Sequence, residues 1–145
     1  MGKKLQNLDE LTHEARVLSE RLAPKTGGAT LVTLSGELGA GKTSFTQALA
    51  KMYGIEEHVT SPTFVLEKVY QLAKDKSFRR LVHIDAYRLK SGEELSALGW
   101  DELMKDARTL VVLEWPEMVA DGLPKADVAI LLTVEPDQSR TIAYA

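Results

Sequence analysis

The residues with the clearest chemical signature form the run Gly36-Glu37-Leu38-Gly39-Ala40-Gly41-Lys42-Thr43. Its spacing matches G-x-x-x-x-G-K-[ST], a phosphate-binding loop. Glycines let such a loop turn tightly and direct backbone N–H groups at a phosphate, and the helix that follows adds unpaired N–H donors. In this pattern the lysine reaches the β- and γ-phosphates, and the threonine hydroxyl binds Mg²⁺. The run therefore predicts a nucleotide site in which Lys42 contacts phosphate and Thr43 contacts magnesium.

Two carboxylates are candidates for the magnesium and hydrolysis chemistry, because each ends a strand-like apolar run. Asp85 ends LVHID, and Glu114 ends LVVLE. A carboxylate at the C-terminal end of a buried parallel strand points toward the crevice where ligands bind. A phosphate loop also needs an acid that holds the hydration shell of its magnesium ion. We expect both acids at the site, and the spacing leaves open which of them lies nearer the metal.

The nucleotide base can be predicted from what the chain lacks. Guanine selection usually requires Asn-Lys-x-Asp, and the only asparagine of the chain is Asn7, in the N-terminal segment. Asp85 is followed by Ala86-Tyr87-Arg88, which does not match the Asp-x-x-Gly switch of GTPases. The sequence therefore favours an adenine nucleotide, ATP or ADP, with Mg²⁺.

Three uses of this nucleotide stay open on the residues alone. The chain is an ATPase, a nucleotide sensor without hydrolysis, or a small-molecule kinase in which Asp85 accepts a hydroxyl proton and Arg88 stabilises the transferred phosphate. Its 145 residues are few for a kinase with an acceptor pocket and a lid. The run Thr60-Ser61-Pro62-Thr63-Phe64 follows the phosphate loop where switch segments often lie, so its hydroxyls are candidates for orienting water or contacting Mg²⁺.

Hydrophobic periodicity predicts the elements that position these residues. The early strand–loop–helix unit indicates an α/β fold. We expect one domain over residues 1–145 with a P-loop NTPase fold, in which helices flank a mixed, mainly parallel sheet. The expected helices are a segment capped by Asn7 and ended before Gly27, then 42–53, 93–104 with a possible interruption at Gly99, and 116–119. The expected strands are 30–34, 64–70, 81–85, 110–113, and a closing hairpin of 128–134 and 141–144.

Composition restricts the classes of function. The net charge of −3 gives no global basic field for non-specific binding to nucleic acid, although residues 74–80 form a local basic loop. The absence of cysteine excludes thiolate catalysis and cysteine-bound metals. No run approaches the roughly 18 apolar residues of a membrane helix, and the N-terminus lacks the apolar run of a signal peptide. We expect a cytoplasmic protein without a membrane partner.

The motifs in their order resemble one family. GELGAGKTSF, TSPTF, HIDAYRL, LEWPE and the pair Leu123-Pro124 are similar to the bacterial TsaE (YjeE) family. The phosphate loop is common to many families, whereas the ordered set SPTF, HxDxYRL and EW is much more specific. The resemblance extends from Thr12 to Arg140 and implies a small P-loop ATPase required for the threonylcarbamoyladenosine modification of tRNA.

The resemblance also assigns roles to single residues. The loop residues Glu37 to Thr43 would bind the nucleotide phosphates and magnesium. Glu114 would be the magnesium-associated acid, and Asp85 the Walker B-type acid needed for hydrolysis. Thr63 would lie in a switch-like loop. Three further positions would contact the nucleotide, namely Thr12 near the base, Trp115 near the phosphates, and Arg140 in a less defined role. Residue type alone predicts core packing for Trp115, a surface charge for Arg140 and a hydrogen-bonded structural role for His83.

Partners are implied by the same resemblance. TsaE-like proteins act with TsaB and TsaD, the pair that transfers the threonylcarbamoyl group to the adenosine next to the anticodon. In that scheme the present chain performs no transfer, and its slow ATP hydrolysis drives or resets the complex. The tRNA would be held mainly by the partners, in agreement with the acidic net charge of this chain.

Overall fold

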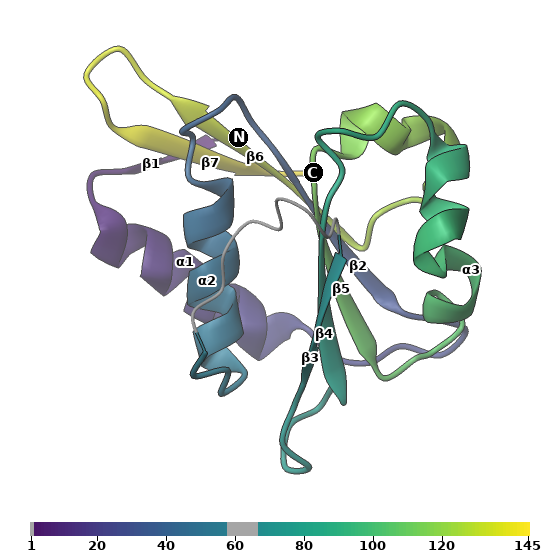
Figure 1. Ribbon diagram of the computed structural model, residues 1–145. Helices are drawn as coiled ribbons and strands as arrows, with labels where there is room; N and C mark the ends of the chain where they lie inside the picture. The colour runs from purple at the N-terminus through teal and green to yellow at the C-terminus, as the bar shows by residue number, and fades with distance from the viewer. Residues whose placement is uncertain (1, 58–66) are drawn as a thin grey trace.

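A seven-stranded sheet lies at the centre of the computed structural model, which describes residues 2–57 and 67–145 (Figure 1). The strand order among the described residues is β1-β7-β6-β2-β5-β4-β3. The strands are β1 (Gly2–Leu5), β2 (Thr30–Ser35), β3 (Glu67–Gln71), β4 (Arg80–Asp85), β5 (Thr109–Glu114), β6 (Val128–Val134) and β7 (Arg140–Tyr144). The α-helices are α1 (Leu8–Arg21), α2 (Lys42–Met52) and α3 (Trp100–Leu103), and the 3₁₀ segments are η1 (Gly92–Leu98) and η2 (Pro116–Gly122).

The sheet is mixed, as the sequence predicts. The four central strands β6, β2, β5 and β4 pair in parallel, whereas β1–β7, β7–β6 and β4–β3 pair antiparallel. The near-continuous apolar runs of β2, β4 and β5 explain this placement, because a central parallel strand is buried on both faces. The expected α/β fold with a mixed sheet flanked by helices is confirmed.

Helices cover both faces of this sheet (Figure 1). The α1–α2 face is packed with alternate strand residues such as Val32, Leu81 and Val112, together with Phe45 and Leu49 of α2. The α3 face takes the intervening strand residues with Leu95, Trp100 and Leu103. Since successive strand residues point to opposite faces, this alternation decides which side chains meet α2. Among the described residues, no helix is long and apolar enough to cross a membrane.

The helices that precede and follow β2 along the chain, α1 and α2, begin where the sequence predicts. Asn7 caps α1, and its side-chain oxygen accepts a hydrogen bond from the Glu10 N–H at 3.0 Å. The second helix, α2, begins at Lys42 and ends at Met52, with Tyr53 as its C-cap and Gly54 beyond it in a left-handed conformation. Glycine adopts that conformation without steric cost, so the stop signal seen in the sequence acts as expected.

Two expectations need correction. Gly99, with φ +75°, interrupts the helix expected over 93–104, as the sequence suggests, but the part before it is the 3₁₀ segment η1 and the part after it is only the short helix α3. Strand β1 was not expected, since GKKL shows neither an apolar run nor alternation. It forms because β7 offers a free edge to pair with. Of the strand expected over 64–70, only residues from 67 onward are described, and they lie in β3.

Tyr53 gives a stability prediction, because its hydroxyl is buried without a hydrogen-bond partner among the described residues. Burial raises the pKa of Tyr53 to about 12. At pH 8 we expect Tyr53→Phe to leave the free energy of unfolding unchanged or to raise it, because the variant no longer buries an unpaired hydroxyl. The edge-on ring contact with Phe78, at 6.0 Å between centroids, does not require that hydroxyl.

The same substitution should change the alkaline stability profile. In the unfolded wild type Tyr53 ionises near pH 10, whereas in the folded protein it keeps its proton up to about pH 12. The unfolded state therefore binds fewer protons over that interval, and stability falls as the pH rises. Urea unfolding from pH 8 to 12 should show a smaller fall for Tyr53→Phe, and identical profiles would contradict the prediction.

Candidate nucleotide site

The phosphate loop and both predicted acids lie at the same edge of the sheet. Strands β2, β5 and β4 are parallel neighbours, so their C-terminal ends are adjacent. The loop 36–41 follows β2, Glu114 ends β5, and Asp85 ends β4, where it is the register partner of Glu114. This is the edge where ligands bind in open α/β sheets.

The loop backbone shows why glycines occupy the ends of the motif. Gly36 has φ +149°, and a Cβ atom there would collide with the carbonyl oxygen of Leu132 on β6. Gly41 has φ +104° and is the N-cap of α2, without a side-chain cap. The first N–H groups of α2 therefore have no capping side chain and are available to an anion.

Lys42 begins α2 and turns back under the loop. Its ammonium donates to the backbone carbonyl oxygens of Gly36 and Glu37, the latter at 3.0 Å. It also lies 4.1 Å from the centre of the Trp115 ring, within cation–π distance. Burial lowers the pKa of Lys42, and nearby carboxylates, Glu114 first among them, oppose that shift.

Glu114 is the acid that contacts the loop helix. The residue is 2% exposed, and its carboxylate accepts a hydrogen bond from the Thr43 hydroxyl, at 3.3 Å to Oε1 and 3.5 Å to Oε2. The ring Nε2 of His83, on the neighbouring strand β4, lies 2.5 Å from Glu114 Oε2. His83 is fully buried, so its predicted role as a hydrogen-bonded buried histidine agrees with this contact.

Asp85 lies beside Glu114 and is more open. Its Oδ1 accepts a hydrogen bond from the backbone N–H of Tyr87 at 3.0 Å. Asp85, Glu114, Lys42 and Thr43 line one cavity of about 350 Å³, together with Tyr87 and Trp115. We call it the carboxylate cavity. It brings together the residues that the sequence predicts for phosphate, magnesium and hydrolysis.

Trp115 combines the two roles considered for it. Its ring packs partly against the core on the α3 face and also contacts both Lys42 and the ring of Tyr87, with 4.8 Å between the ring centroids. Its backbone is left-handed, at φ 61°, while its N–H donates to the Leu34 carbonyl at 3.1 Å. A non-glycine residue in this region is strained by about 1–2 kcal/mol, and such strain clusters at functional sites.

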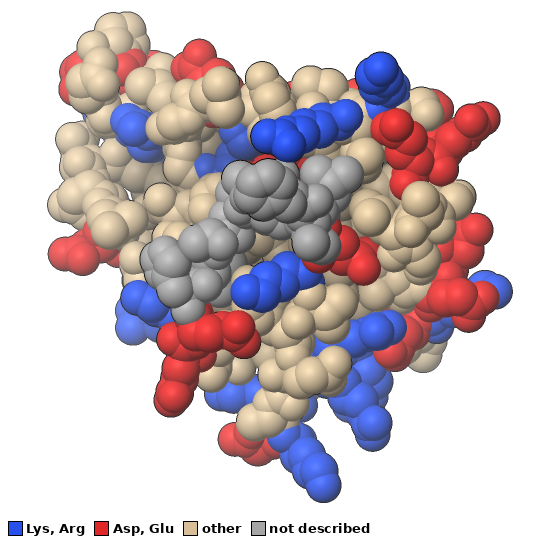
Figure 2. Space-filling model, viewed as in Figure 1, with Lys and Arg blue, Asp and Glu red and all other residues tan. Residues whose placement is uncertain are grey.

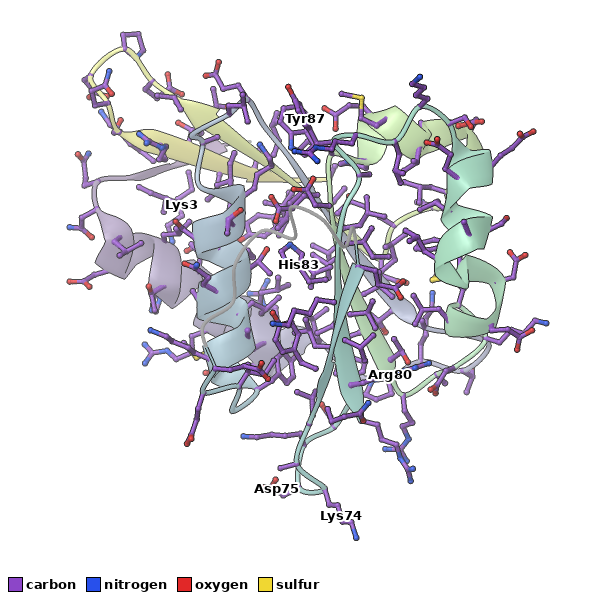
Figure 3. The ribbon with its side chains drawn as sticks, viewed as in Figure 1. Lys3, Lys74, Asp75, Arg80, His83 and Tyr87 are labelled. Atoms are coloured by element: carbon purple, nitrogen blue, oxygen red, sulfur yellow. The ribbon has the colours of Figure 1, made fainter. Side chains whose placement is uncertain are left out.

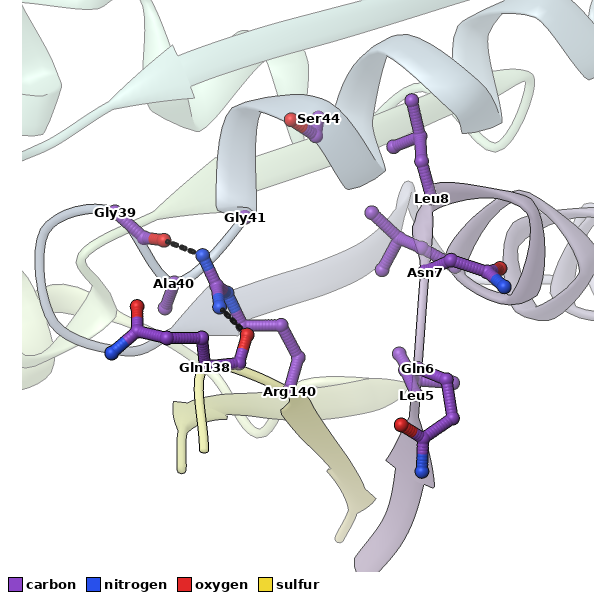
Figure 4. A pocket seen from close by; sticks show the side chains of 11 residues that line it. Leu5, Gln6, Asn7, Leu8, Gly39, Ala40, Gly41, Ser44, Gln138 and Arg140 are labelled. Carbon is purple, nitrogen blue, oxygen red and sulfur yellow. Dashed lines mark hydrogen bonds between the residues drawn. The ribbon is translucent and has the colours of Figure 1, made fainter. Parts of the chain in front are cut away.

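A second cavity, of about 290 Å³, lies on the other side of the loop (Figure 4). We call it the hairpin cavity, because Gln138 and Arg140 of the β6–β7 hairpin line it opposite Leu5, Leu8 and Leu11. Gly39, Gly41 and Ser44 line both cavities. Figure 4 shows the Arg140 guanidinium reaching the loop, where it donates to the Gly39 carbonyl at 3.0 Å and to the Gln138 carbonyl at 2.6 Å. Arg140 is thus attached to the phosphate loop.

The remaining predicted site residues are placed as follows. Glu37 and Leu38 are exposed on the loop, and Ala40 is buried beneath it. Thr12 is half-buried on α1 and is not among the residues that line either cavity, whereas Leu8 and Leu11 of the same helix are. Thr63 lies outside the described residues, as does the rest of TSPTF. The nucleotide roles of Thr12 and Thr63 stay predictions.

The oxygen ligands in the carboxylate cavity suit magnesium. Among the described residues no three His, Cys, Asp or Glu side chains converge into a metal cage. Mg²⁺ is usually held by one or two carboxylates plus substrate phosphates and water, rather than by a closed protein cage. The Thr43 hydroxyl and the carboxylates of Glu114 and Asp85 fit that donor set.

The basic loop of residues 74–80 is separate from this site. Figure 3 shows Lys74 and Asp75 at the tip of the β3–β4 loop, at the end of the sheet opposite Tyr87. Figure 2 shows Lys and Arg side chains along that lower edge, whereas acidic side chains gather over η1 and α3. The loop is therefore a distinct basic surface and no part of the nucleotide site.

Comparison with known proteins decides the family. The family model described as "Threonylcarbamoyl adenosine biosynthesis protein TsaE" matches residues 5–142. The chain belongs to the TsaE family. The TsaE protein of Streptomyces coelicolor is 45% identical over 103 residues, which cover 70% of this chain and 67% of that protein. The TsaE protein of Treponema pallidum is 42% identical over 115 residues, which cover 79% and 81%. All carry the name "tRNA threonylcarbamoyladenosine biosynthesis protein TsaE".

A solved structure shows the same fold. The crystal structure of Bacillus subtilis YdiB superposes with a TM-score of 0.78 at 28% identity, covering 99% of this chain and 83% of that one. The TsaE protein of Bacillus subtilis is 31% identical over 131 residues, 90% of this chain and 78% of that protein. The resemblance seen in the motifs is thereby confirmed at the level of family and fold.

Sequence reasoning missed two features of this TsaE chain's site. The hairpin cavity includes Gln6 and Asn7, which follow β1, a strand that the residue pattern does not predict. Nor did it pair His83 with Glu114, because the contact joins residues on two strands. The run His83-Ile84-Asp85 was the available signal, since residues two apart in a strand lie on the same face. It places His83 on the face of Asp85, where the acids were expected.

Proposed function

We propose that this protein is an ATP-binding, slowly ATP-hydrolysing P-loop ATPase that serves tRNA threonylcarbamoyladenosine biosynthesis. The observation that carries the ATPase part is the contact between the Thr43 hydroxyl and the Glu114 carboxylate beside Lys42, which joins the phosphate loop to a strand-end acid. The tRNA pathway rests on membership of the TsaE family. Such a role implies a cytoplasmic protein.

In this proposal the chain binds the nucleotide across both cavities. The α2 N-terminus and the loop N–H groups hold the phosphates, and Lys42 gives up its carbonyl partners to reach the β- and γ-phosphates. The adenine lies in the hairpin cavity, where Leu5, Leu8 and Leu11 supply apolar contact and Arg140 supplies a flat cationic face. The shared lining residues Gly39, Gly41 and Ser44 connect the two parts.

The two acids have different roles in this proposal, Glu114 at the magnesium ion and Asp85 at the attacking water. Thr43 and Glu114 would hold Mg²⁺, because their oxygens already face each other. When bound, the ion would neutralise charge on the phosphate oxygens. Asp85, at the open edge of the carboxylate cavity, would orient the attacking water and accept its proton. Trp115 would shield the phosphates from bulk water, as it covers Lys42.

The partners we propose are TsaB and TsaD, with the tRNA held mainly by them. The net charge of −3 gives this chain no global attraction to RNA. ATP binding and hydrolysis would then drive or reset the complex that modifies the adenosine next to the anticodon.

Phosphate release with and without partners tests this function. We expect slow hydrolysis by the isolated protein with ATP and Mg²⁺, and a rise of about 10-fold or more when TsaB and TsaD are added together, because the partners would order the site. An equal mass of albumin is the control. Fast ATP hydrolysis whose rate does not change when both partners are added would contradict the proposal. Transfer of the phosphate to an added small molecule would favour the kinase instead.

A further inference from the structure

His83 is buried at a position where a hydrophobic side chain would cost less free energy to bury. It lies on β4 between apolar neighbours, is 0% exposed, and faces the α1–α2 side of the sheet (Figure 3). Its register partner on β5 is the apolar Val112. Burying an imidazole costs free energy unless its polar atoms find hydrogen-bond partners. We therefore expect His83 to make a hydrogen bond that offsets this cost.

That contact is the carboxylate of Glu114. His83 Nε2 lies 2.5 Å from Glu114 Oε2, within hydrogen-bond distance of a carboxylate acceptor. The other ring nitrogen, Nδ1, is buried without a partner among the described residues. The ring hydrogen therefore belongs on Nε2, because this tautomer donates to the carboxylate and leaves no N–H group unpaired at Nδ1.

The two donors meet the carboxylate of Glu114 in different ways. Oε2 accepts from His83, whereas the Thr43 hydroxyl lies within reach of both oxygens, at 3.3 Å from Oε1 and 3.5 Å from Oε2. The imidazole thereby fixes the rotation of the carboxylate about its last bond and holds Oε1 toward Thr43 and the carboxylate cavity.

We propose that His83 is a positioning residue for magnesium, which it never touches: it holds Glu114 in the orientation in which the acid and Thr43 hold the ion together. This inference rests on the proposed function, because it assumes that Glu114 and Thr43 bind Mg²⁺. Outer hydrogen bonds of this kind orient metal-binding side chains, and their loss typically lowers metal affinity by about 10- to 100-fold.

Two isosteric substitutions separate positioning from mere packing. In His83→Gln the side-chain amide nitrogen can occupy the place of Nε2 and donate to Glu114, whereas in His83→Asn it reaches only the place of Nδ1. Both variants introduce an amide into the same buried site, but only His83→Asn also loses the bond to the buried Glu114, so it should be the less stable of the two. The pair thus differs mainly in the hydrogen bond to Oε2.

The measurement is a calorimetric titration of Mg²⁺ into protein saturated with ADP, together with ADP binding in EDTA. We expect His83→Asn to raise the apparent dissociation constant for Mg²⁺ by about 10-fold or more, with ADP affinity in EDTA within about twofold of wild type. His83→Gln should stay within about threefold of wild type for Mg²⁺. Thermal unfolding midpoints should fall in both variants and further in His83→Asn, which loses the bond to Glu114.

Other results would overturn the inference in distinguishable ways. Equal magnesium affinities for the Gln and Asn variants, with ADP still bound, would remove the role of His83 alone. A wild-type protein that binds no ADP would overturn the proposed function and this inference with it. Should the variants fail to fold, nitrogen-15 NMR of wild-type imidazoles decides, because a His83 ring with its hydrogen on Nδ1 and none on Nε2 excludes the proposed bond, whereas a hydrogen on Nε2 supports it.

Discussion

Replacing Lys42 with alanine should lower the affinity for ATP and ADP by about 100-fold or more, the largest effect we expect on binding. A hydrogen bond to a charged group contributes about 1.5–3 kcal/mol, and the lysine would make one to each of two phosphates. Each 1.4 kcal/mol is a tenfold change in affinity, so two such bonds correspond to a factor of at least about 100. Isothermal titration calorimetry with ATP or ADP in the presence of Mg²⁺ measures this directly.

The structure supplies a matched control for this experiment. Lys51 lies on the same helix, α2, but is exposed in its last turn, far along the chain from the loop. Lys51→Ala should therefore bind ADP like wild type. The free energy of unfolding should be measured for both variants, because Lys42→Ala also leaves the Gly36 and Glu37 carbonyls without their donor. Unchanged nucleotide affinity in a folded Lys42→Ala protein would refute the phosphate site.

The second large effect concerns the two acids, which should fail in different ways. Asp85→Asn should lower partner-stimulated ATP hydrolysis by about 100-fold, the usual contribution of a positioned general base. Nucleotide affinity should change little, because Asp85 is only partly buried at the cavity, whereas Glu114 is the acid that contacts Thr43. Glu114→Gln should instead raise the Mg²⁺ concentration needed for half-maximal activity, since it removes the charge that faces the ion.

Glu117→Gln is the control for these acids. Glu117 is exposed just beyond β5 and is close enough to act electrostatically on Lys42, but it is not among the residues lining the carboxylate cavity. It should retain wild-type turnover and magnesium dependence. The experiment also separates an ATPase from a sensor: if Asp85→Asn abolishes hydrolysis while tRNA modification by the reconstituted system continues unchanged, nucleotide binding alone suffices and hydrolysis is not the driving step.

The basic loop of residues 74–80 shows how the fold limits an interpretation from composition. The sequence places four cations within seven residues. In the fold these residues lie at the end of the sheet opposite the candidate nucleotide site, and part of their charge is paired within the protein, since Arg80 lies 3.3 Å from Asp106. A contact of this loop with RNA or an acidic partner would therefore be independent of the phosphate site.

The α3 region illustrates why local patterns fail at some boundaries. Its helical periodicity is real, and Leu95, Trp100 and Leu103 are buried as a periodic face requires. Gly99, at φ +75°, divides the segment into η1 and α3, an interruption that the glycine itself indicates, but the 3₁₀ form of η1 is not indicated by the sequence. Close approach of the backbone at Gly92 and Gly122, where a Cβ on either would collide with the other, fixes η1 against η2. A contact between segments so far apart in the sequence does not appear in the hydrophobic periodicity of either segment.

What the sequence by itself determined was local. The loop 36–43, the strand before it and the helix after it depend on hydrogen bonds and backbone angles of neighbouring residues, so residue type and spacing are enough to predict them. The burial of the central strands likewise follows from their apolar runs. These features predict a phosphate site with a strand-end acid on each of two further strands.

Only the tertiary structure decided how distant residues complete that site. Thr43 meets Glu114 across 71 positions of sequence, and Arg140 reaches Gly39 across 101. The pairing of His83 with Glu114 depends on the register between β4 and β5. Strand order and register follow from burying the whole sheet between its helices, a property of the entire chain, so no single motif specifies which acid faces the threonine or which arginine holds the loop.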